Sequence, residues 1–147
     1  MIGGGRKTTG TDTGSVQEMQ VQMGGNEIRD KTPRIAEFGF SSNPPDGSDA
    51  VVVFFGGDRS QGIVIATGHQ ATRIKNLLPG ESALYDSIGK KIYLSASGIV
   101  IEAGGQPVTI SNASAVTITS SGTITLNGNV RVNGTITASG AVTPNVP

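Results

Sequence analysis

The stretch from residue 92 to residue 147 constrains the fold most, because apolar residues recur along it in pairs spaced two positions apart. Successive pairs begin 9, 8, 8, 6 and 6 residues after one another, with Thr, Ser, Asn, Gly and Ala between them. A period of two predicts a strand, and the regular return across Gly or Asn indicates short strands joined by tight turns. Self-similarity at this pitch is typical of a repeat architecture. We call the Ile, Val and Leu residues of these pairs the apolar stripe: Ile99, Ile101, Val108, Ile110, Val116, Ile118, Ile124, Leu126, Val130, Val132 and Ile136.

The apolar stripe predicts self-association. Between positions 92 and 147 only Glu102 and Arg131 are charged, so little electrostatic repulsion opposes pairing of the strand edges with another chain. In a single chain, burial of the stripe contributes less free energy than the ordering of residues 92–147 costs in conformational entropy. Three stretches wound around a common axis would bury the stripe, and closed cyclic symmetry would stop the pairing from continuing into fibrils. We therefore expect residues 80–147 to form an intertwined trimeric β-helix with the stripe as its core.

The charge pattern separates this stretch from the rest of the chain. Charged residues make up 15% of the sequence, below the ~25% of typical soluble domains, and nearly all precede residue 92. The formal net charge of +0 gives no electrostatic attraction to nucleic acid or to an anionic membrane surface. Cysteine is absent, which excludes disulfides and thiolate metal sites. The sequence shows neither an apolar run near 18 residues nor the basic and apolar regions of a signal peptide, so neither a membrane span nor general secretion is expected.

Residues 1–79 are predicted to form a small barrel of four or five strands. Two apolar runs, residues 50–55 and 63–66, flank a Gly-rich loop and predict a hairpin. Met19, Val21 and Met23 alternate with polar residues, which predicts a half-buried strand over residues 16–23. A barrel of the oligonucleotide/oligosaccharide-binding (OB) type fits this inventory, and other small barrels fit it nearly as well. The expected fold is therefore all-β, with an OB-type barrel followed by the trimeric β-helix.

The remaining N-terminal segments are interpreted from composition. Residues 1–14, rich in Gly and Thr, are interpreted as a flexible lead-in, and residues 26–34, charged and containing a proline, as a connection between strands. Ile35, Phe38 and Phe40 are candidates for the barrel core. The Pro-Pro-Asp-Gly sequence within residues 41–49 predicts a turn.

No catalytic residue, cofactor or metal is expected. His69 is the only side chain suited to acid–base work near neutral pH, and no Ser or Cys pairs with it by pattern. The Gly-rich loop at residues 56–60 lacks the Gly-Lys-Ser/Thr ending and the following helix of a phosphate-binding loop, which favours a hairpin turn. Asp46, Asp49 and Asp58 lack the regular spacing of a calcium loop. Binding of single-stranded nucleic acid requires exposed aromatic side chains in a basic groove, and most of the six aromatic residues lie in runs expected to be core.

Several short motifs resemble those of a known family. They are Ile28-Arg29-Asp30, Ala36-Glu37-Phe38-Gly39-Phe40-Ser41-Ser42, Gly57-Asp58-Arg59-Ser60 before Gly62-Ile63-Val64-Ile65-Ala66, and Leu78-Pro79-Gly80-Glu81. With these motifs the chain resembles the baseplate spike, or tail-puncturing, proteins of contractile-tailed phages of the Mu-like kind. The resemblance implies a homotrimer in the tail baseplate of a virion, made in the host cytoplasm. It also implies that the barrel docks on the tail hub and that the β-helix tapers to a tip that crosses the host outer membrane during tail contraction.

The C-terminal end departs from that family. Relatives often carry a His-x-His pair near the tip, where three copies surround an iron ion. Residues 139–147 contain no His, Asp or Glu, so an octahedral imidazole site cannot be built from them. We expect either a metal-free apex or a tip closed by packing of Val142, Pro144, Val146 and Pro147, and a separate capping protein is a further open alternative. Inward-facing Asn127, Asn129 and Asn133 could hold an axial ion or water, although turn positions explain these residues more simply.

The predicted role is mechanical: a stiff, narrow and nearly uncharged prism that transmits the force of contraction. Two other classes of function stay open. A receptor-binding tail fibre or adhesin would recognise a cell-surface glycan, and glycan binding by the purified trimer would favour it. A polysaccharide-degrading β-helix enzyme would need a pair of carboxylates on the prism. Glu102 is the only carboxylate after Asp86, which makes the enzyme the weaker of the two alternatives.

Overall fold

The computed structural model of the chain describes residues 1–143, and over that range the protein is all-β, as predicted. It divides into one compact unit over residues 1–108 and a second that begins at Thr109. The strands are β1 (Ile2–Thr11), β2 (Gln17–Gln22), β3 (Ile28–Arg34), β4 (Asp49–Phe54), β5 (Gly62–Gly68), β6 (Ser82–Tyr85), β7 (Lys91–Ser95) and β8 (Gly98–Glu102), with one 3-10 turn at Phe55–Gly57. Within the described range, no helix is long and apolar enough to cross a membrane.

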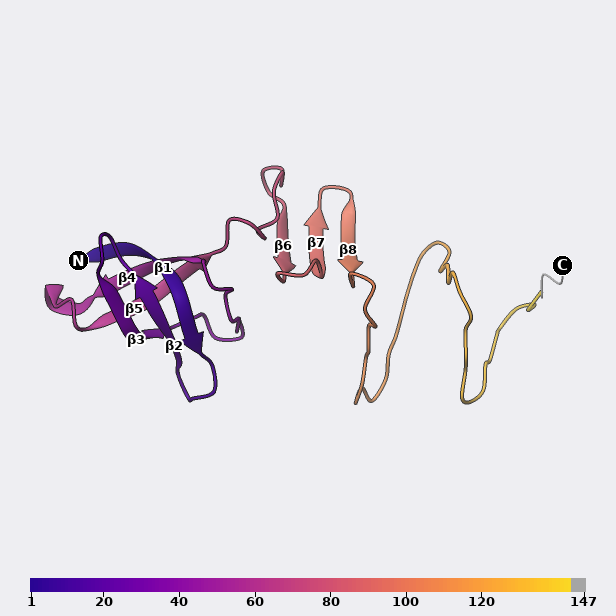
Figure 1. Cartoon of the computed structure of the whole chain (residues 1–147). Helices are drawn as coiled ribbons and strands as arrows, with labels where there is room; N and C mark the ends of the chain where they lie inside the picture. Colours follow the sequence, from indigo (N-terminus) through magenta and orange to yellow (C-terminus); the bar gives the residue numbers. More distant parts are fainter. Residues whose placement is uncertain (144–147) are drawn as a thin grey trace. The chain divides into compact units, whose positions relative to one another are not determined.

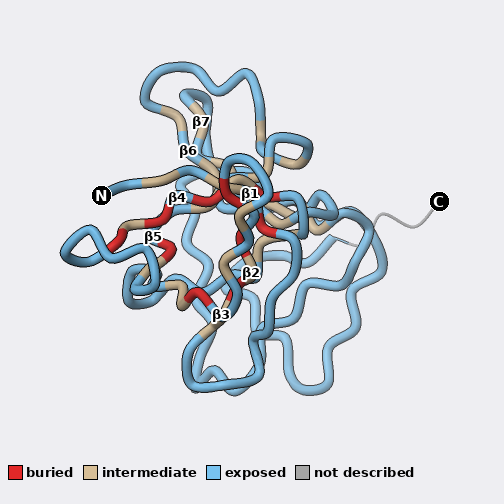
Figure 2. The backbone as a smooth tube through the Cα atoms, turned by 60° about the vertical axis from the view of Figure 1, so that its left-hand side comes forward, coloured by how far each residue is buried: buried red, intermediate tan, exposed pale blue. Residues whose placement is uncertain are grey.

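Strands β1 to β5 form a closed barrel in the order β1-β2-β3-β5-β4 (Figure 1). All pairs are antiparallel except β3 with β5, which close the barrel in parallel through Arg34 and Val64. Five strands in this closed form agree with the predicted small barrel, and five is the strand number of an OB barrel. The buried apolar residues all come from β2, β4, β5 and the residue after β2: Met19, Val21, Met23, Ala50, Val52, Phe54 and Val64. Figure 2 shows that burial is confined to the barrel strands and their connections.

The interpretation of residues 1–14 as a flexible lead-in was wrong. Residues 2–11 form β1, which pairs with both β2 and β4. Glycine is needed there for space: a Cβ on Gly5 would lie 2.6 Å from Val21 Cγ1 and 2.7 Å from the Gln22 carbonyl oxygen. Because the strand contributes backbone pairing and close approach instead of apolar side chains, its composition resembles that of a loop.

The interpretation of residues 26–34 as a connection was also wrong, because β3 occupies most of this segment. A register shift interrupts its pairing with β2, and Lys31 adopts a left-handed conformation with φ 50° in the interrupted part. Pro33 is tolerated because β3 makes only one bridge to β5, at Arg34, so most of that edge carries no ladder of hydrogen bonds.

The three proposed core residues Ile35, Phe38 and Phe40 lie on the surface, with 57%, 103% and 67% exposure. They follow β3 in a loop, where no strand turns them toward the barrel. The view that most aromatic residues are core was therefore wrong, since Phe54 alone of the six is buried. The expectation that nucleic acid is not a partner rests on the net charge of +0 and no longer on aromatic burial.

The predicted hairpin is confirmed as β4 and β5. Its connection contains the 3-10 turn, with Gly56 and Gly57 at φ 56° and 80°, and Asp58 then accepts hydrogen bonds from the Ser60 backbone N–H (2.8 Å) and hydroxyl (2.7 Å). These bonds to Ser60 lower the pKa of the Asp58 carboxyl. The Gly-rich loop is thus a hairpin turn whose carboxylate is used locally.

Strands β6, β7 and β8 form a separate antiparallel sheet within the first unit, in the order β6-β7-β8 (Figure 1). The described residues after Glu102, positions 103–143, contain no strand or helix. In this single chain the predicted β-helix is therefore represented only by the two-residue spacing of the apolar stripe.

Candidate assembly surface

One face of the β6-β7-β8 sheet is apolar. Directly paired residues of neighbouring strands share a face, and side chains alternate between faces along a strand. The register pairs Leu84 with Ile92, Ile92 with Ile101, and Leu94 with Ile99. We call this set the apolar face: Leu84, Ile92, Leu94, Ile99 and Ile101. All five residues are exposed, by 42% to 69%, so nothing within the described chain covers the apolar face.

The opposite face of the same sheet has a different chemistry. It carries Tyr93, Lys91, Glu102 and Val100, again by register. Lys91 Nζ forms an ion pair with a Glu102 carboxylate oxygen at 3.0 Å. Polar side chains that are paired with one another suit a face that remains in water, whereas five neighbouring exposed aliphatic residues mark an interaction surface.

Glu81 fixes the sheet to the segment that precedes it. One carboxylate oxygen accepts hydrogen bonds from the Leu78 backbone N–H (2.9 Å) and the Tyr93 hydroxyl, and the other accepts the Ala96 N–H (3.0 Å). The Tyr93 hydroxyl is the main cause that lowers the pKa of Glu81, and the two backbone N–H groups add to it. The same bond to the carboxylate raises the pKa of Tyr93. One carboxylate thus joins the strand β7, the β7–β8 turn and the incoming chain.

Asp86 shapes the turn between β6 and β7. It accepts the backbone N–H groups of Ile88 (2.9 Å) and Lys90 (3.0 Å) and pairs with Lys90 Nζ at 2.5 Å. The hydrogen bond from the Lys90 side chain is the main cause that lowers the Asp86 pKa to about 2. Gly89, with φ 100°, adopts a conformation that few other residues reach. This polar turn fixes the register of β6 against β7, which places Leu84 beside Ile92 on the apolar face.

The eleven residues of the apolar stripe are all exposed, by 46% or more. The structure brings only Ile99 and Ile101 together, as neighbours on β8 within the apolar face. The nine others, from Val108 to Ile136, lie beyond the last strand. Of the predicted tip residues, Val142 is exposed, and Pro144, Val146 and Pro147 lie outside the described residues.

Sequence reasoning did not include three members of the apolar face: Leu84, Ile92 and Leu94. Ile92 and Leu94 already showed the two-residue spacing of the stripe. Leu84 precedes a turn that contains Asp86 and Gly89, so its pairing with Ile92 could have been inferred from a hairpin around that turn.

The candidate polar residues of the barrel lie apart and have local partners. The Nδ1 atom of His69 is 2.8 Å from the Thr72 hydroxyl oxygen. Asp46 pairs with Lys7 Nζ at 2.7 Å, and Asp49 pairs with Arg6 at 3.5 Å. Among residues 1–143, no three His, Cys, Asp or Glu side chains gather where they could hold a metal ion.

Comparison with known proteins supports the resemblance read from the motifs. Residues 6–71 match the model of the family described as Bacteriophage Mu Gp45, N-terminal. The chain is 32% identical over 87 residues to the baseplate puncturing device gp45 of Escherichia phage Mu, a match that covers 59% of this chain and 44% of that protein. It is 31% identical over 85 residues to the Mu-like prophage FluMu protein gp45 of Haemophilus influenzae, covering 58% and 46% of the two chains. The matched region thus spans less than half the length of either relative.

Proposed function

We propose, from the premise that residues 6–71 form a domain of the Bacteriophage Mu Gp45 N-terminal family, that this chain is a structural component of a phage tail baseplate. In this role it would reside in the virion. The relative from phage Mu is named a baseplate puncturing device, which supports this place in the tail. Three copies would wind residues 80–147 into a central spike, and residues 1–79 would form the collar that docks on the tail hub. The spike would pierce the host outer membrane when the tail contracts.

The observation that carries this proposal is the uncovered apolar surface of the single chain. The apolar face and the apolar stripe expose aliphatic side chains from Leu84 to Ile136, whereas those of the barrel strands β2 and β4 are largely buried. Exposed aliphatic surface is unfavourable by about 25 cal/mol per Å², so a partner that buries it stabilises the assembly. Two identical chains offer the same spacing of apolar residues and the same free strand edges. Three chains wound into a closed assembly would bury the apolar residues and pair the free strand edges.

The proposed action is mechanical and needs no catalytic residue, cofactor or metal. Only two charged residues lie between positions 92 and 147, so entry into a bilayer would carry little cost of removing water from charges. Thr, Ser, Ala and Gly dominate between the aliphatic residues, which keeps the cross-section of the spike small. Aliphatic ladders on the axis would resist buckling because interiors of this kind are closely packed.

A charge placed on the axis tests the proposal. We expect the unmodified protein to sediment as a trimer that resists mild detergent, and Ile118→Asp to abolish the trimer because three carboxylates would be buried together. Thr117→Asp is the matched control, since its side chain would point outward from the same strand. Unchanged sedimentation of Ile118→Asp would contradict burial of Ile118 on the axis of the trimer.

A further inference from the structure

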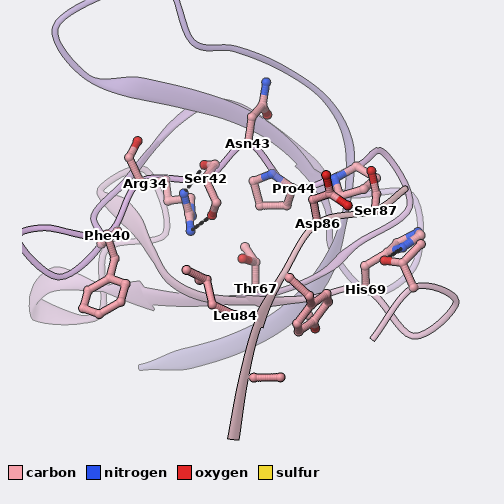
Figure 3. Close-up of a pocket in the computed structure, with 17 residues that line it drawn as sticks. Arg34, Phe40, Ser42, Asn43, Pro44, Thr67, His69, Leu84, Asp86 and Ser87 are labelled. Carbon is pink, nitrogen blue, oxygen red and sulfur yellow. Dashed lines mark hydrogen bonds between the residues drawn. The ribbon is translucent and has the colours of Figure 1, made fainter. Parts of the chain in front are cut away.

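The loop over residues 35–42, which we call the aromatic loop, is hydrogen-bonded at its base to Arg34 and Gln17. Arg34 Nη1 donates to the Ser42 carbonyl oxygen (2.7 Å), and Nη2 lies 3.0 Å from the Ser42 hydroxyl oxygen (Figure 3). Gln17 Nε2 donates to the same carbonyl (3.1 Å), and its Oε1 accepts from Arg34 (2.9 Å). Inside the loop the Phe40 N–H bonds to the Glu37 carbonyl (3.0 Å) beside Gly39 at φ 89°. These bonds connect the end of the loop to β2 and β3 and close a turn around Gly39.

The aromatic loop presents an unusual side chain. Phe38 is fully exposed, at 103%, and Phe40 is exposed by 67%. The hydrogen bonds of the loop reduce the conformational entropy that its backbone loses when the ring inserts into a partner. Aromatic residues, Phe among them, are enriched in the buried centres of protein interfaces. Phe38 therefore has the properties of an anchor without a pocket of its own.

A cavity of about 520 Å³ lies beside this loop (Figure 3). Its apolar wall includes Phe40, Pro44, Leu84 and Tyr85, and its polar groups include His69. The volume is within the range of pockets that accept organic ligands, and it exceeds what one aromatic ring requires. The cavity could therefore receive an aromatic side chain.

The cavity is continuous with the surface that the proposed function assigns to contacts between copies. Leu84 lines the cavity and also belongs to the apolar face. In a cyclic trimer each copy uses two different patches, one toward each neighbour. The chain offers two complementary patches of this kind: the projecting Phe38 and the apolar cavity.

We propose that Phe38 of one copy inserts into the cavity of the neighbouring copy, so that three such contacts link the copies of the trimer. This inference rests on the proposed three-chain assembly. It adds a second interface, one that belongs to the first unit of the chain and does not depend on the apolar stripe.

Photo-cross-linking of the full-length protein tests this contact. A benzophenone amino acid replaces Phe38, and irradiated protein is analysed on a denaturing gel and by peptide mapping. We expect bands of two and three linked chains, with position 38 joined to residues 43–45 or 84–87 of another copy. The same amino acid at Phe55, which is 54% exposed in the β4–β5 connection, is the control and is expected to give no linked chains.

A variant that fills the cavity completes the test. Thr67 lines the cavity, and Thr67→Trp is expected to abolish cross-linking from position 38 while the mass of the assembly stays at three chains. Trimers that give no cross-link from position 38, links to a different surface, or an unchanged yield in Thr67→Trp would each overturn the inference and leave the spike intact. A single-chain mass for the unmodified protein would instead overturn the proposed function.

Discussion

The barrel and the C-terminal stretch use the same two-residue spacing of aliphatic residues with opposite results. In β4, Val52 is fully buried because the closed sheet folds its inner face upon itself. In β8, Ile99 and Ile101 have the same spacing and remain exposed by 69% and 66%. A closed barrel buries the inward-facing residues of its own strands, whereas an open three-stranded sheet needs another surface to bury its apolar face. Alternation therefore predicts which residues share a face, and closure decides whether one chain can bury them.

The largest effect is expected from a charge in the barrel core, which would unfold the barrel, whereas a charge in the C-terminal stretch would not. Val52→Asp places an unpaired carboxylate at a site with 0% exposure, so we expect the barrel to lose its cooperative fold. Ile118→Asp is expected to remove assembly while the barrel keeps its thermal transition, followed by circular dichroism. Equal loss of the barrel transition in both variants would show that the regions do not fold independently.

Charges placed on the two faces of β8 are expected to have different effects on assembly. Ile101 belongs to the apolar face and Val100 to the opposite one. We expect Ile101→Asp to abolish trimers and Val100→Asp to retain them, as measured by sedimentation. Loss of the trimer in both variants would mean that the sheet is covered on both faces.

A smaller effect is expected from the barrel's close-packed glycine. Gly5→Ala would bring a Cβ to 2.6 Å from Val21 Cγ1, so we expect the free energy of unfolding of the barrel to fall by about 1–3 kcal/mol. Gly4→Ala is the control, because no atom lies within 4 Å of a Cβ built there. Denaturant unfolding measures both. Equal stability of the two variants would contradict the assignment of β1 to the barrel.

The smallest expected effect concerns pH. The pKa of Glu81 is lowered in the fold, so its stabilising bonds are fully present above the carboxyl's ordinary value of 4.5 and are lost as the pH falls through the lowered value. We expect Glu81→Gln to lower the thermal midpoint more at pH 7 than at pH 3. Glu37→Gln, at an exposed loop position, is the control. A penalty for Glu81→Gln that does not change with pH would exclude a role for the charge.

Sequence alone predicted the strands whose alternating apolar residues face the interior of the barrel. Met19, Val21 and the β4–β5 hairpin were correct because burial dictates alternation there. β1 and β3 were missed because Gly-rich packing and a charged strand with Pro33 leave no such pattern. Phe38 and Phe40 were misplaced because hydrophobicity alone does not distinguish a core residue from an exposed anchor. The stripe was recognised from its spacing, whereas Leu84 required the register that the Asp86 turn imposes.

Native mass spectrometry of the unmodified, full-length protein determines whether the chain assembles as a trimer. We expect a species with three times the 15.0 kDa mass of the chain and no stable single chain. A folded species of 15.0 kDa whose residues 92–143 stay ordered in dilute solution would contradict it.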